Sequence, residues 1–215
     1  MKCALRLRRA AAGTAAALLL MAAAAHAAMP VRDPDWPCQQ IKVPRLSLGA
    51  LWDGPDVAPY ESTWSQDAAV AALAGRIVQR RMPLDQAQQA IRGFAASAGP
   101  QRQPQLLALM AGVFSLLDGQ RSQVIAGLDR FGARQKQLAA EIVANMDKLR
   151  AEPAEGGDVA PVRPGDLSDQ IGWQTRVFEQ RRQAISYACG VPDAIEQRLF
   201  ALARTISASL GPATP

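Results

Sequence analysis

The feature that most constrains this chain is a long stretch without proline between Pro104 and Pro153. Apolar residues recur in it at steps of three and four, with one additional step of four between positions 124 and 128, as on one face of a helix. A mean spacing of about 3.5 is typical of a coiled-coil seam, and the additional step reads as a stutter. The seam residues are Leu106, Met110, Val113, Leu117, Val124, Leu128, Phe131, Leu138, Ile142 and Leu149.

A second seam follows after residues 151–165, a segment rich in proline and glycine that turns the chain. The two seams predict an antiparallel helical hairpin over 104–211, in which paired residue numbers sum to about 316 if the turn is centred near Asp158. Gly190 and Pro192 predict a kink just after Cys189. The second seam contains Ile171, Phe178, Ile185, Ala188, Ile195, Leu199, Leu202 and Ile206.

Residues 63–99 predict two short helices that pack on the hairpin. The sequence Thr63-Trp64-Ser65-Gln66 matches a capping box and is expected to begin the first of them, while Pro83 is expected to be the first residue of the second. The predicted fold class is therefore all-α, a helical bundle of two short helices and a long antiparallel coiled-coil hairpin.

Residues 28–62 precede the helices and contain prolines at intervals that exclude a long helix. The segment also carries more apolar residues than a solvated linker, so we expect an irregular, largely extended strap laid across the helices. Its tryptophans and the one just after it have two interpretations, packing against the helices or binding a partner as exposed aromatic anchors. These residues are Trp36, Trp52 and Trp64.

The N-terminus has the order of a Sec-type signal peptide over residues 1–27. Basic residues precede an apolar run, and the small residues Ala25 and Ala27 flank a position in the way that signal peptidase accepts. We expect cleavage after Ala27 or Ala28 and a mature protein in the periplasm of a Gram-negative bacterium. The alternative is an uncleaved anchor in the inner membrane. The basic residues are Lys2, Arg6, Arg8 and Arg9.

Cys38 and Cys189 are the cysteines that remain in the mature chain. Export to an oxidising compartment favours a disulfide between them. Redox-active or intermolecular thiols are the competing interpretations, but there is no Cys-x-x-Cys motif to support a redox site.

Cleavage of the signal peptide also makes several functions of the mature chain less favourable. The loss of its four positive charges lowers the net charge from +5 to +1, which withdraws the support for nucleic acid as a partner. The single histidine, His26, leaves with it, and no cluster of acidic residues has metal-ligand spacing. The sequence therefore predicts no catalytic residue, no metal and no cofactor.

Three polar residues fall on the hairpin seam, where an unpaired polar group is costly. They are Gln135, Gln174 and Arg181. The predicted register places Arg181 opposite Gln135, and such a pair would fix the register of the two helices. The alternative is a polar notch that grips an anionic ligand.

These patterns favour an exported, non-enzymatic binding, scaffold or accessory protein that uses its hairpin and strap. Its partner would be another periplasmic protein or a second copy of the chain. One alternative is a carrier of a small apolar ligand or lipid. An unrecognised enzyme, which would need convergent buried carboxylates, is the other. The carrier would hold its ligand in a cavity walled by Leu73, Ile77, Phe94, Val113 and Phe114.

Overall fold

The computed structural model describes residues 33–151 and 166–211. The predicted signal peptide and nearly all of the predicted turn lie outside these residues. Within them the regular elements are α-helices and short 3-10 helices, with no strand, which confirms the all-α prediction.

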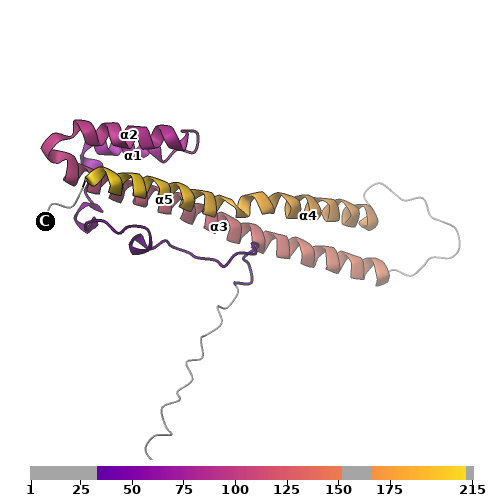
Figure 1. The fold of residues 1–215 in the computed structure, drawn as a ribbon. Helices are drawn as coiled ribbons and strands as arrows, with labels where there is room; N and C mark the ends of the chain where they lie inside the picture. The colour runs from indigo at the N-terminus through magenta and orange to yellow at the C-terminus, as the bar shows by residue number, and fades with distance from the viewer. Residues whose placement is uncertain (1–32, 152–165, 212–215) are drawn as a thin grey trace, which may run out of the picture. The chain divides into compact units, whose positions relative to one another are not determined.

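Three helices form the long hairpin (Figure 1). Helix α3 (Arg102–Ala151) packs against both α4 (Leu167–Cys189) and α5 (Val191–Leu210), which run back along it. Gln135 Nε2 donates to the Phe178 carbonyl oxygen at 3.3 Å. Asn145 Nδ2 donates to Gln174 Oε1 at 3.1 Å. Both contacts lie less than one helical turn from the predicted register, so the hairpin is antiparallel as expected.

The predicted kink is a break between two helices. Helix α4 ends at Cys189, and Gly190 donates its backbone N–H to the Tyr187 carbonyl oxygen at 3.3 Å. Pro192 then occupies the first turn of α5, where its missing N–H costs no helical hydrogen bond. The chain thus changes helix directly beside the cysteine.

The short helices are α1 (Ala68–Ile77) and α2 (Leu84–Ser97). The prediction that the capping box at Thr63 begins α1 was wrong, because Trp64–Gln66 form the 3-10 helix η3 instead. Asp67 is the N-cap, and its Oδ1 accepts the N–H groups of Ala69 and Val70 at 2.9 and 3.1 Å. A carboxylate at that position satisfies two free N–H groups at once and faces the positive end of the helix.

The core lies where α1 and α2 meet the first half of α3 and all of α5. Its largest fully buried side chains include Ile77, Ile91, Leu109, Leu199 and Leu202. The five residues predicted to wall a ligand cavity belong to this packed cluster. Leu73, Ile77 and Val113 are buried, and Phe94 and Phe114 pack against them. The carrier hypothesis gains no support from these residues, since they fill space with one another.

The strap, from Asp33 to Ser62, follows α3 and contains the 3-10 helices η1 (Leu48–Ala50) and η2 (Ala58–Tyr60). Trp52 is only 9% exposed, and its indole N–H donates to the Pro55 carbonyl oxygen at 2.8 Å. Trp64 lies over Gly112 of α3, so closely that a Cβ there would come within 2.6 Å of the indole ring. These two tryptophans pack into the protein, which corrects the alternative that they present a partner-binding surface.

Candidate functional site

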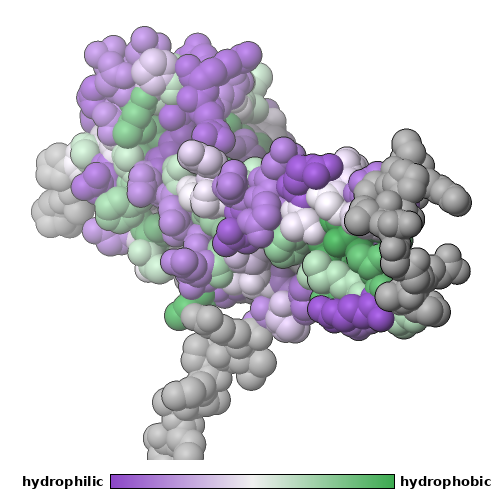
Figure 2. Space-filling model, turned by 90° about the vertical axis from the view of Figure 1, so that its right-hand side faces the viewer, coloured by the Kyte–Doolittle hydropathy of each residue, from purple (hydrophilic) through white to green (hydrophobic). Residues whose placement is uncertain are grey.

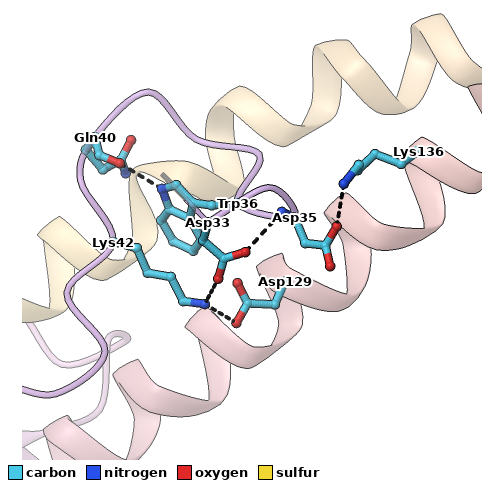
Figure 3. Close-up of polar contacts among 7 residues, drawn as sticks. All are labelled: Asp33, Asp35, Trp36, Gln40, Lys42, Asp129 and Lys136. Atoms are coloured by element: carbon cyan, nitrogen blue, oxygen red, sulfur yellow. Dashed lines mark hydrogen bonds and ion pairs between the residues drawn. The ribbon is translucent and has the colours of Figure 1, made fainter. Parts of the chain in front are cut away.

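The strap is fixed to the hairpin by a cluster of charged residues that we call the strap dock, formed by Asp33, Asp35, Lys42, Asp129 and Lys136 (Figure 3). The Lys42 ammonium lies between two carboxylates, 2.5 Å from Asp33 Oδ2 and 2.9 Å from Asp129 Oδ2. The hydrogen bond from Lys42, helped by the N–H of Asp35, lowers the pKa of Asp33. Hydrogen bonds to Asp33 and Asp129 raise the pKa of Lys42. Both members of the pair are therefore charged at neutral pH.

The strap also covers the break between α4 and α5. Trp36 Nε1 donates to the Gln40 carbonyl oxygen at 2.7 Å, which closes a tight loop (Figure 3). Gln40 Nε2 in turn donates to the Cys189 carbonyl oxygen at 2.5 Å, satisfying an acceptor that the end of α4 leaves free. The Cys38–Cys189 disulfide joins the same places, with the Cα atoms 5.7 Å apart, and confirms the predicted bond.

Beside the dock lies a small hollow of about 120 Å³, lined by Trp36, Arg121 and Glu196 among others. Arg121 Nε donates to Glu196 Oε1 at 2.6 Å, and its Nη1 donates to the Val43 carbonyl oxygen at 2.7 Å. Its side chain is 5% exposed. These hydrogen bonds of Arg121 hold the strap against α3 and α5.

The three polar seam residues differ in burial and in their hydrogen bonds. Gln174 is buried and accepts the hydrogen bond from Asn145, and Gln135 donates to the Phe178 carbonyl oxygen, as described above. Arg181 is exposed and, within the described residues, Gln135 Oε1 has no hydrogen-bond partner, so the predicted pairing of these two side chains was wrong. Gln135 reaches a backbone carbonyl oxygen of α4 instead, and the Arg181 side chain lies in solvent.

The end of the hairpin carries a second candidate surface. We define the distal arm as α3 from Gln137 onward together with the facing part of α4 up to Phe178. In the described residues these two helices alone form it, since the strap dock reaches no further than Lys136. Figure 2 shows hydrophobic surface there, beside the residues drawn in grey. The large exposed apolar side chains are Val143 (57%), Met146 (37%), Leu149 (39%) and Trp173 (60%).

Trp173 is the most exposed tryptophan among those described, although none of the predicted sites included it. It lies between the seam positions Ile171 and Gln174, both buried against α3. A bulky aromatic residue between two seam positions points away from the partner helix, and that was the available signal.

A third feature was also missed, a groove of about 580 Å³ beside α2 and α5. Arg92, Arg102 and Arg204 line it, and they come from α2, α3 and α5. No spacing in the sequence links residues so far apart. In residues 33–151 and 166–211, no group of His, Cys, Asp and Glu side chains is arranged to hold a metal ion.

No protein-family profile, curated protein or solved structure matches this chain. The disulfide fits an oxidising compartment. Among the described helices, none combines the length and the apolar character needed to cross a bilayer.

Proposed function

We propose that this chain is an exported, non-enzymatic binding or accessory protein that holds another periplasmic protein through its distal arm. The observation that carries the proposal is the exposure of Val143, Met146, Leu149 and Trp173 on a part of the hairpin that, among the described residues, α3 and α4 form alone. Exposure of four large apolar side chains on so short a part of the hairpin favours an interaction site there.

The base of the arm is stiff, which favours binding. Helix α3 runs without a break from the core to the arm, and the strap clamps it at Asp129 and Lys136. A preorganised surface loses little conformational entropy when a partner binds. The disulfide adds a covalent link at the same level and supports folding in an oxidising compartment.

Export is tested by expressing the full chain in a Gram-negative bacterium and measuring the intact mass of the periplasmic material with and without reductant. We expect the mass of a chain cleaved after Ala27 or Ala28, lower by two hydrogens before reduction. A full-length mass in the membrane fraction would instead support the inner-membrane anchor.

Partner binding is tested in the same cells with a photo-crosslinking amino acid at position 143 or 173. We expect crosslinks to one defined protein, identified by mass spectrometry. With that protein purified, Trp173→Ala should weaken binding by about 30-fold or more, as loss of an aromatic anchor does. Tyr187 is a matched control, because this exposed aromatic residue (85%) lies on α4 outside the arm.

Equal crosslinking from position 187, or an unchanged affinity of Trp173→Ala, would contradict a partner site on the arm. Crosslinks between two copies of the chain, accompanied by a dimer in solution, would replace the foreign partner by self-association.

A further inference from the structure

The groove beside α2 and α5 lies on the opposite side of the core from the distal arm and takes no part in the proposed function. Figure 1 shows α2 running alongside α5, and the first turn of α3 adds Arg102 to the groove wall. Ala95 and Ala201 are buried lining residues. Their small side chains leave the space of about 580 Å³ that larger residues would fill.

The groove is strongly positive. Among the described residues, its lining includes Arg92, Arg102 and Arg204 but no Asp or Glu. Within the described part of the chain, none of the three guanidinium groups forms an ion pair. Three like charges around one hollow repel each other and concentrate a positive potential there, which an anion would relieve.

Two of the arginines are held in place. Arg102 Nε donates to the Ser209 carbonyl oxygen at 2.8 Å, so its terminal nitrogens keep their N–H groups for another acceptor. The Arg204 guanidinium lies over the ring of Phe200, 4.7 Å from its centre. A cation stacked on an aromatic face keeps its N–H groups free at the edge of the guanidinium plane. The donors are therefore partly oriented before any ligand arrives.

From these observations we propose that the groove binds a phosphomonoester whose organic part is apolar. A phosphomonoester carries a charge of about −1.5 to −2 at neutral pH and three strong acceptor oxygens, which suits three arginines. A carboxylate has one charge and is satisfied by a single guanidinium fork. The alanine side chains of the groove offer an apolar surface to the organic part.

The test measures the affinity of the mature, disulfide-bonded protein for phenyl phosphate by calorimetry, with phenol as the uncharged comparison. Arg92→Gln combined with Arg204→Gln should weaken binding by at least about 10-fold, because charge-assisted hydrogen bonds are lost. Arg102 stays unchanged, since its bond to Ser209 joins α3 to α5. The control, Arg80→Gln with Arg181→Gln, removes the same charge from exposed positions outside the groove.

A second experiment distinguishes a soluble phosphomonoester from a lipid whose headgroup is a phosphomonoester. Vesicles of phosphatidylcholine with phosphatidic acid are compared with pure phosphatidylcholine in a sedimentation assay. Binding of either phosphomonoester that is lost in the groove variant and kept in the control supports the proposal and identifies the source. The proposal is overturned if neither binds, if the control loses binding equally, or if phenol binds as well as phenyl phosphate.

Discussion

The carbonyl oxygen of Asp35 rests directly on Gly132 of α3, where a Cβ atom would overlap it. At this contact the backbone of the strap lies directly against the backbone of α3, with no side chain between them. It positions Lys42 beside Asp129 and Cys38 beside Cys189. The strap dock therefore requires glycine at position 132.

Replacing Gly132 with alanine should therefore destabilise the protein. We expect a loss of about 1–3 kcal/mol, typical of overpacking, which outweighs the helix propensity that alanine adds. Urea denaturation measures the free energy of unfolding. Gly119 of the same helix is the control, since a Cβ there meets nothing within 4 Å. Gly119→Ala should stabilise by up to about 1 kcal/mol, and similar effects at both positions would refute the role of Gly132.

Removing the disulfide should loosen the strap and leave the helices formed. Replacing both Cys38 and Cys189 with alanine is expected to cost about 2–5 kcal/mol, because the bond closes a long loop in the unfolded chain. Circular dichroism should show unchanged helix content, while limited proteolysis should cut the strap sooner. Reduction of the unmodified protein provides the comparison. A denaturation midpoint that does not move on reduction would contradict a stabilising bond.

The buried Arg121 side chain should matter far more than an exposed arginine. Arg121→Met leaves the Val43 carbonyl oxygen and the Glu196 carboxylate without their donor, so we expect a loss of about 2 kcal/mol. The control is Arg150→Met, which removes an exposed ion pair with Asp147 and should change stability by less than about 0.5 kcal/mol. Thermal unfolding of both variants checks the prediction. Equal shifts would show that burial of Arg121 contributes nothing.

Acid should weaken the cap of α1. Hydrogen bonds from the Val70 N–H and the Gln105 side chain lower the pKa of Asp67 below its ordinary value. Its stabilising effect is therefore present above the ordinary aspartate pKa of about 3.9 and is lost as the pH falls through the lowered pKa of the folded protein.

Two variants separate the cap from its charge. Asp67→Ala should cost about 1 kcal/mol at neutral pH, whereas Asp67→Asn should retain most of the cap. Stability measured between pH 2 and pH 7 should fall less steeply at the acid end for Asp67→Asn than for the unmodified protein. Parallel curves would show that Asp67 does not contribute to the acid dependence.

The sequence alone determined the helices and their pairing, because these depend on local and periodic properties. Prolines bound the longest stretch that can form helix, and apolar residues at helical spacing mark the face that α3 must bury. Cys38 and Cys189 were predictable as a pair because both follow the predicted signal peptide. The first residue of α1 was harder to predict, because both Thr63 and Asp67 can cap a helix. Asp67 is the N-cap, since its carboxylate accepts two N–H groups.

Only the tertiary structure decided which residues are covered, which are exposed and which lie close together. Four glycines in α3 look alike in the sequence, yet the strap lies on Gly132 and the Trp64 ring on Gly112. That Gln135 bonds to a backbone carbonyl oxygen while Arg181 lies in solvent depends on how two complete helices pack. The arginine groove brings together Arg92, Arg102 and Arg204 from three helices. Such proximity arises from packing across the core, and no local pattern or spacing along the chain encodes it.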